Sequence, residues 1–185
     1  MINLVMEYMD CGSIDTLIAV EKHFKSPEER QNGPLIPEVI ISKFVSHVLM
    51  GLVYLHEEKR QLHRDLKSDN ILVESKYGMA KLTDFGISKR LGVNNMGQNN
   101  TSTRTYTGTL CYMSPERLAN QEYSFPSDIW SLGVVVFEMA TGEHPFPITD
   151  HPIEIENLIN NFPAPSLQGD PRVSPELANF VQRCM

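Results

Sequence analysis

The chain reads His63-Arg64-Asp65-Leu66-Lys67-Ser68-Asp69-Asn70 at its most informative point. This run places a carboxylate, an ammonium group and a carboxamide close together on one polar segment, at Asp65, Lys67 and Asn70. A carboxylate accepts a proton from a hydroxyl, a cation stabilises developing negative charge, and carboxylate and amide oxygens bind Mg²⁺. A charged surface loop is the alternative interpretation of this run alone, so its meaning depends on the segments around it.

A second motif, Asp84-Phe85-Gly86, follows nineteen residues after Asp65 (84 − 65). Between the two motifs, the segments 71–73 and 80–82 flank a turn that contains Gly78, and we predict that they form two short strands. Because a hairpin returns the chain to its starting point, we expect Asp84 to lie in the same cleft as Asp65.

Two further motifs follow in order. Gly108-Thr109 precedes Tyr112-Met113-Ser114-Pro115-Glu116, and Ser127-Asp128-Ile129-Trp130-Ser131-Leu132-Gly133 begins a strongly apolar segment. In this order the four motifs resemble the catalytic loop, the metal-binding loop, the end of the activation segment and a central helix of protein kinases. The sequence is therefore identified as a member of the protein kinase family.

The resemblance implies a role for each matching residue. Asp65 accepts the proton of a protein hydroxyl, Lys67 stabilises the transferred phosphoryl group, and Asn70 and Asp84 hold Mg²⁺. The implied ATP-binding residues are Met6, Glu7, Met9, Ser13 and Leu72. The implied regulatory residues are Arg64, Thr101, Thr105 and Thr109. The implied structural residues are His63, Phe85, Glu116 and Asp128, of which Asp128 holds the backbone of the catalytic loop.

Hydrophobic periodicity predicts the elements around these motifs. Helices are expected at 13–23, from Pro37 through 40, 44, 48, 52 and 55, from Ser127 as N-cap to Thr141, at 153–160 and from Pro175 onward. Residues 2–6 are expected to form a short buried strand. The predicted fold is mainly α with a small β hairpin, as in the C-terminal lobe of a kinase. Residues 1–12 are then the last strand of the N-terminal lobe and the hinge, and residues 13–185 are the C-terminal lobe.

No two glycines in the 185 residues are separated by one residue, so the sequence contains no G-x-G-x-x-G loop. Lys81, in Met79-Ala80-Lys81, follows the catalytic loop and is interpreted as a solvent-facing strand residue, not as the nucleotide-binding lysine of kinases. These features predict a partial kinase domain whose isolated chain is inactive. A catalytically inactive binding or decoy module is the alternative hypothesis.

Within the family, Lys67 is typical of serine/threonine kinases. The run Tyr112-Met113-Ser114-Pro115-Glu116-Arg117-Leu118 resembles the MAP kinase kinase group, with dual specificity as a further possibility. Thr101 and Thr105 have the four-residue spacing at which that group is activated by phosphorylation. The resemblance implies ATP and Mg²⁺ as cofactors, a protein substrate such as a MAP kinase, and an upstream activating kinase. Ser68-Asp69 departs from the proline-containing form common in this group.

Composition narrows the remaining classes. A net charge of −7 and a pI near 5.3 argue against a nucleic-acid partner. The three cysteines are an odd number without a C-x-x-C pair, which predicts free thiols in a reducing compartment. The sequence shows no secretion signal and no uninterrupted apolar run of about 20 residues, so we expect no membrane partner and a cytoplasmic location.

Overall fold

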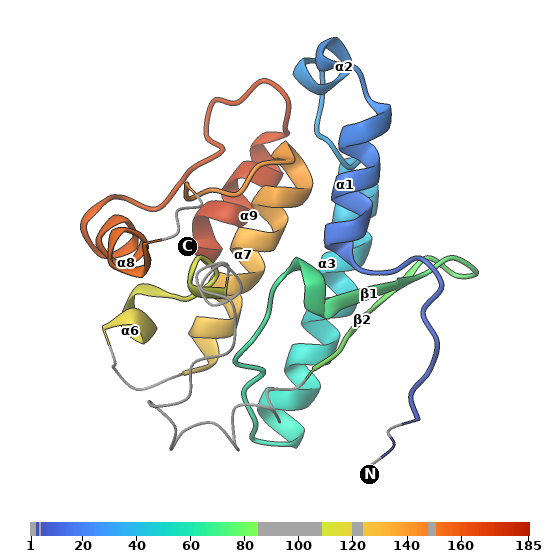
Figure 1. Cartoon of the computed structure of the whole chain (residues 1–185), viewed down its shortest axis with the longest axis vertical. Helices are drawn as coiled ribbons and strands as arrows, with labels where there is room; N and C mark the ends of the chain where they lie inside the picture. Colours follow the sequence, from blue (N-terminus) through green and yellow to red (C-terminus); the bar gives the residue numbers. More distant parts are fainter. Residues whose placement is uncertain (1–2, 4, 85–108, 120–123, 148–150) are drawn as a thin grey trace.

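The computed structural model describes residues 3, 5–84, 109–119, 124–147 and 151–185 (Figure 1). It confirms the predicted fold class, because this part of the chain consists mainly of helices and a single two-stranded sheet. The longer helices are α1 (Ile14–Phe24), α3 (Glu38–Val53), α7 (Phe125–Thr141), α8 (Pro152–Asn161) and α9 (Pro175–Cys184). The short helices are α2 (Pro27–Gln31) and α6 (Pro115–Leu118), and the strands are β1 (Ile71–Glu74) and β2 (Met79–Leu82).

Helix α7 is the centre of the core. Its apolar residues are buried on nearly every side, and Val134, Val135 and Val136 have no exposed surface. It packs against α3 on one side and α9 on another. Figure 1 shows α7 between these two helices. A helix that is apolar all round is expected in the middle of a lobe, where every face meets protein.

The prediction that Ser127 is the N-cap of α7 is wrong by three residues. The helix begins at Phe125, and Ser124 occupies the N-cap position. Pro126 lies in the first helical turn, where the missing N–H costs no hydrogen bond. The Ser127 hydroxyl instead accepts from the Ser124 N–H at 3.4 Å, as the third residue of a capping box does.

Helix α3 supplies the second layer of the core. Phe44, Val48 and Leu52 are buried at helical spacing, and the helix contacts β2 and α7. A π-helical turn, Tyr54–Glu58, continues it toward the catalytic loop. In the described residues, Glu38–Glu58 is the one stretch long and apolar enough to cross a membrane by length and composition. One such helix is weak evidence of a membrane span, because the core helix of a globular protein meets the same criterion, and 33% of this stretch is buried here.

Strands β1 and β2 pair antiparallel, with Ile71 opposite Leu82 and Glu74 opposite Met79. The segment before α1 lies beside β1. Cys11 N–H donates to the Val73 carbonyl at 3.1 Å, and Val73 N–H donates to the Gly12 carbonyl at 2.8 Å. These bonds hold the residues just before α1 against β1, the first strand of the hairpin that leads to Asp84.

The predicted buried strand at residues 2–6 is not found in the described part of that segment. Val5 is 96% exposed, and neither it nor residues 6–9 belong to a strand. A strand needs a neighbour to accept and donate ladder hydrogen bonds, and the described residues place none beside this segment. The apolar pattern of residues 2–6 therefore predicted a strand that the described part of this segment does not form.

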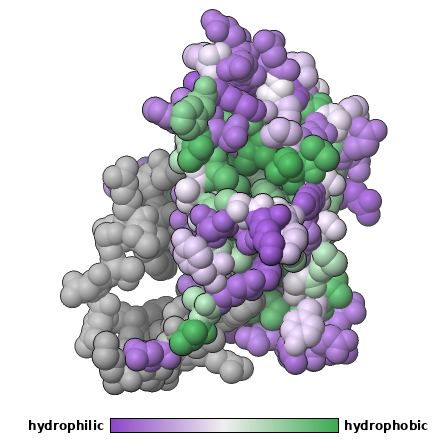
Figure 2. All heavy atoms as spheres, turned by 90° about the vertical axis from the view of Figure 1, so that its right-hand side faces the viewer, coloured by the Kyte–Doolittle hydropathy of each residue, from purple (hydrophilic) through white to green (hydrophobic). Residues whose placement is uncertain are grey.

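The surface carries apolar side chains mainly on helices. Figure 2 shows apolar atoms gathered in the upper half of the face that carries α1. Val20 and Phe24 are the exposed large apolar residues of α1, and Val39 is exposed at the start of α3. Helices α2, α6, α8 and α9 each begin with proline in the first turn, which ends the preceding loop sharply.

Candidate functional site

The loop that begins at His63 is held by a buried aspartate of α7. Asp128 has no exposed surface, and its Oδ2 accepts from the backbone N–H of His63 at 2.9 Å. Its Oδ1 accepts from the backbone N–H of Arg64 at 3.1 Å. His56 donates from Nε2 to Oδ2 at 2.8 Å, and its ring stacks on Phe125 at 4.5 Å. One carboxylate therefore fixes two consecutive peptide groups of the loop.

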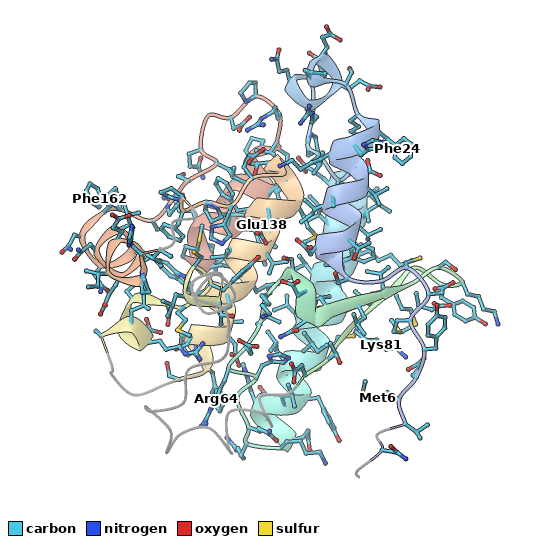
Figure 3. The ribbon with its side chains drawn as sticks, viewed as in Figure 1. Met6, Phe24, Arg64, Lys81, Glu138 and Phe162 are labelled. Carbon is cyan, nitrogen blue, oxygen red and sulfur yellow. The ribbon has the colours of Figure 1, made fainter. Side chains whose placement is uncertain are left out.

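The backbone of Arg64 has φ = 67°, which is rare for a residue with a side chain. Such a conformation persists where the surroundings determine it, and it is found at functional sites more often than elsewhere. The two hydrogen bonds to Asp128 supply that constraint. They turn the chain so that Asp65 follows directly after the fixed peptide. The side chain of Arg64 is exposed and lies toward the lower end of the molecule in Figure 3.

Asp65, Lys67 and Asn70 lie together. The Asn70 side-chain amide donates to the Asp65 carbonyl at 2.7 Å and to Asp65 Oδ2 at 3.2 Å. Lys67 Nζ lies 3.8 Å from the same Oδ2. Lys67 also reaches Thr109 Oγ1 at 3.5 Å. The loop thus presents a carboxylate, a cation and an amide within one small region, and Thr109 comes to it from a distant part of the sequence.

The hairpin brings Asp84 back to this region. Thr83 N–H donates to the Asn70 carbonyl at 3.0 Å, and the Thr83 carbonyl accepts from His63 Nε2 at 3.0 Å. Since a carbonyl only accepts, Nε2 carries the proton of the His63 ring. Burial lowers the pKa of His63, so the ring is neutral at pH 7. Asp84 follows with φ = 58°, a second left-handed residue at the site.

The donor set at Asn70 and Asp84 suits a magnesium ion. The Asn70 NH₂ group is engaged by Asp65, so the amide oxygen is the atom of this side chain that could bind a cation, and Asp84 is exposed and offers carboxylate oxygens. Mg²⁺ is commonly bound by one or two such side chains together with phosphate oxygens and water. Among the described residues, no group of three or more His, Cys, Asp and Glu side chains forms an all-protein metal cage.

The predicted nucleotide-binding residues fall into two sets. Ser13 and Leu72 lie opposite each other across an antiparallel bridge, so the structure brings them together. Met6 is 65% exposed, and Met9 is half-buried. The side chain of Glu7 pairs with Lys81 Nζ at 2.7 Å. Lys81 therefore lies on the surface of β2, as its place after the catalytic loop predicts (Figure 3).

Glu116 is held from α7. Ser127 donates its hydroxyl to Glu116 Oε1 at 2.6 Å, which ties α6 to the first turn of α7. Sequence reasoning gave Glu116 a structural role but not this partner. Phe85, Thr101 and Thr105 lie outside the described residues.

Sequence reasoning missed a buried hydrogen-bonded chain beside the catalytic loop. The Ser68 hydroxyl lies 2.9 Å from Tyr112 Oη, which is 2.8 Å from both carboxylate oxygens of Glu138. Ser131 donates to the Tyr112 carbonyl at 2.8 Å. Glu138 extends from α7 near the middle of the lobe (Figure 3). The available signal was the carboxylate of Glu138 in the mostly apolar second half of the helix.

The environment of Glu138 favours its neutral form. Burial raises its pKa to about 8, against the opposing effect of the hydrogen bonds from Tyr112 and Ser68, and Asp15 and Asp69 add like-charge repulsion. Burial also raises the pKa of Tyr112 well above its ordinary range, and the neighbouring Glu138 adds to this shift. Tyr112 is therefore a neutral hydroxyl at every physiological pH.

Comparison with known proteins agrees with these features. The family model described as Protein kinase domain matches residues 1–185. Mitogen-activated protein kinase kinase 3 of Arabidopsis thaliana is 38% identical over 184 residues, covering 100% of this chain and 32% of that protein. Mitogen-activated protein kinase kinase 2 of the same plant is 37% identical over 190 residues, covering 100% of this chain and 47% of that protein. MAP kinase kinase skh1/pek1 of Schizosaccharomyces pombe is 39% identical over 190 residues, covering 100% of this chain and 48% of that protein. The chain thus spans from about a third to half the length of these relatives.

Proposed function

Since this chain belongs to the protein kinase family, we propose that it supplies the catalytic loop of a MAP kinase kinase-like enzyme of serine/threonine or dual specificity, which transfers the γ-phosphoryl group of ATP to protein hydroxyls. The 185 residues by themselves contain no G-x-G-x-x-G loop and are expected to be inactive in isolation. The observation that carries the proposal is the meeting of Asp65, Asn70 and the segment ending at Asp84. Asn70 donates to Asp65 at 2.7 and 3.2 Å, and its carbonyl accepts from Thr83 at 3.0 Å. Phosphoryl transfer depends mainly on positioning and electrostatic stabilisation, which this arrangement supports.

Each residue then has a distinct task. Asp65 orients the incoming hydroxyl and accepts its proton. Lys67 lies 3.8 Å from Asp65 and stabilises the negative charge of the phosphoryl group, while its contact to Thr109 links it to the substrate side of the loop. The backbone bonds from Asp128 keep the loop in place during the reaction.

Mg²⁺ neutralises charge on the phosphates of ATP when it is bound. Asn70 and Asp84 are the residues that would hold it, through the amide oxygen and the carboxylate. Ser13 and Leu72, paired at the entrance to α1, would contact the nucleoside, with backbone groups of Glu7 and Met9 at its edge. The side chain of Glu7 is not required for this contact, because it is engaged by Lys81.

Regulation belongs to the same proposal. Phosphorylation of Thr101 and Thr105 by an upstream kinase would add about 1.5 to 2 negative charges at each residue, which Arg64 can pair. Arg64 is exposed and adjacent to Asp65, so such a pair would act on the catalytic loop directly. The MAP kinase kinase relatives support a MAP kinase as the protein substrate.

The proposal is tested by Asp65→Asn in a complete kinase domain that contains these 185 residues together with a glycine-rich ATP-binding loop. Asparagine keeps the shape of the side chain but loses the proton acceptor, so single-turnover phosphoryl transfer should fall by about 10²-fold or more, while Mg-ATP binding persists. Glu143→Gln is the matched control, since that carboxylate is exposed and pairs only with Lys22 on the surface. Transfer at the parent rate by Asp65→Asn contradicts the role of Asp65. No transfer by the parent, with or without activation, favours the binding-module alternative.

A further inference from the structure

We propose that the buried chain Ser68–Tyr112–Glu138 positions the catalytic loop, with Ser68 as a positioning residue whose hydroxyl links the loop to α7. This inference rests on the proposed function for its catalytic consequence, but its structural content can be tested separately. Ser68 lies between Lys67 and Asn70 and is 1% exposed. Any shift of its side chain therefore moves the two residues that surround the reacting groups.

The hydrogen bonds of the chain have a defined direction. A tyrosine hydroxyl has one proton to donate and lone pairs to accept. With Glu138 ionised, Tyr112 donates to a carboxylate oxygen at 2.8 Å, and Ser68 donates to Tyr112 at 2.9 Å. With Glu138 protonated, the carboxyl can donate to Tyr112, which then donates to Ser68. The charge of Glu138 therefore determines which way the Ser68 hydroxyl is engaged.

Helix α7 thereby holds the catalytic loop at two places. Asp128 binds the backbone at His63 and Arg64, where the loop begins. Glu138 acts through Tyr112 on Ser68, where the loop ends in a 3-10 turn, Ser68–Asn70. The two acidic residues are ten positions apart on the helix (138 − 128), or about 15 Å along its axis. A rigid helix with two attachment points fixes the orientation of the loop, whereas one attachment point would leave it free to pivot.

Tyr112 is itself held in place, so a displacement of Glu138 can reach Ser68 through it. Ser131 of α7 donates to the Tyr112 carbonyl at 2.8 Å, and the ring edge packs against His144 at a centroid distance of 5.1 Å. All three members of the chain are less than 10% exposed. Hydrogen bonds in such a dry environment are stronger than in water, and leaving one unpaired is costly.

The titratable groups around Glu138 come from three elements. Asp15 belongs to α1, Asp69 to the 3-10 turn, and Cys111 and Tyr112 to the turn before α6. The ring of His144, in the loop after α7, contacts the ring of Tyr112. The two aspartates repel a charged Glu138. Glu138 therefore gains or loses its proton near neutral pH, and the hydrogen bonds through Tyr112 to Ser68 change direction with it.

The first test is a double-mutant cycle in the same complete kinase domain. Ser68→Ala and Tyr112→Phe should each lower kcat about tenfold with the KM for ATP unchanged, and the double variant should lose no more than either single variant. Ser68→Thr, which keeps the hydroxyl, should recover activity. Thr141→Val is the control, because Thr141 carries a buried hydroxyl on α7. Its partners are the carbonyls of Phe137 and Glu143 and the Glu143 N–H, and none of them belongs to the hydrogen-bonded chain Ser68–Tyr112–Glu138. Losses that multiply in the double variant, or a raised KM with unchanged kcat, overturn the proposal.

The second test does not depend on activity. The NMR signals of the Asn70 side-chain amide report its position beside Asp65. They should shift in both Ser68→Ala and Glu138→Gln, and titrate with pH in the parent but not in Glu138→Gln, while Thr141→Val leaves them unchanged. Asn70 signals that ignore both substitutions overturn the positioning role, whatever the catalytic result. A complete parent kinase domain without kinase activity, but with these coupled shifts, instead defeats the proposed function alone.

Discussion

The buried side chain of Asp128 holds the start of the catalytic loop in place. Its carboxylate has no exposed surface and accepts hydrogen bonds from His56 and from the backbone N–H groups of His63 and Arg64. A buried charge is tolerated only where it is well hydrogen-bonded, and removal of the acceptor leaves its donors unpaired.

We therefore expect Asp128→Asn to destabilise the fold by about 2 to 4 kcal/mol, because an NH₂ group replaces one acceptor oxygen opposite an N–H donor. Urea unfolding followed by circular dichroism measures this loss. Asp170→Asn is the matched control. Its ion pair with Arg172 lies near the surface, and we expect a loss of less than about 1 kcal/mol there. Equal losses in the two variants contradict the special role of Asp128.

Glu138 makes stability depend on pH. Its folded-state pKa of about 8 lies above its ordinary value of 4.5, so the folded state holds a proton that the unfolded state has lost between these values. Its contribution is fully present below pH 4.5 and is lost as pH rises toward about 8, with a slope of at most about 1.4 kcal/mol per pH unit.

Glu138→Gln should remove this slope, so the free energy of unfolding of the variant relative to the parent should rise with pH between about 5 and 8. Unfolding curves at several pH values test this expectation. Glu143→Gln changes an exposed carboxylate and should keep the parent slope. A parallel pH dependence in the parent and Glu138→Gln shows that Glu138 titrates normally.

At the scale of elements, α7 and α9 pack unusually closely. A Cβ added at Gly133 would lie 2.7 Å from Cys184 Cβ and 2.9 Å from Met185 Cγ. Carbon atoms do not approach to this distance without displacement, so Gly133 is needed for the contact between the two helices. The sequence alone could not show this, because the partner residues are about fifty positions away.

Gly133→Ala should force α9 away from α7 and cost about 1 to 3 kcal/mol, even though alanine favours the helix. Gly33→Ala is the matched control, since an added Cβ there meets nothing within 4 Å. The control should change stability by less than about 1 kcal/mol. Thermal unfolding of the two variants makes the comparison, and an unaffected melting temperature in Gly133→Ala would falsify the close packing.

Sequence patterns predicted the elements that carry strong local signals. Five long helices and both strands were found within a few residues, because periodicity and proline positions mark them. The strand expected at residues 2–6 failed because strand formation requires a partner that the local pattern does not reveal. The five-residue helix α2 was missed because so short a segment has no periodicity.

The site, too, could be predicted only in part from the sequence. The loop motif predicted Asp65, Lys67 and Asn70 as neighbours, and the structure places them together. The link from Ser68 to Glu138 could not be predicted, since it joins residues seventy positions apart (138 − 68) through Tyr112. Contacts of this kind depend on how helices pack, which no single motif encodes.

For the whole molecule, the burial pattern predicts how it opens. Hydrogen exchange should be slowest for the amides of 134–136, which lie in α7 with no exposed surface, and fastest in α2, which has no buried residue. Mass spectrometry of exchanged peptides measures the order. Peptides from α3 should follow α7, because the two helices pack together in the core. Exchange in α7 as fast as in α2 contradicts a core built on α7.

The two backbone bonds between Cys11–Gly12 and Val73 have a mechanical consequence. The segment runs antiparallel to β1, so a pull on residues 5–9 along the strand loads both bonds in shear, and they resist it together. The force that these bonds carry, apart from the force carried by the covalent chain into α1, passes along β1 to Ile71 and its neighbour Asn70. Part of any tension at this end of the chain would thus reach Asn70, the residue that donates to Asp65.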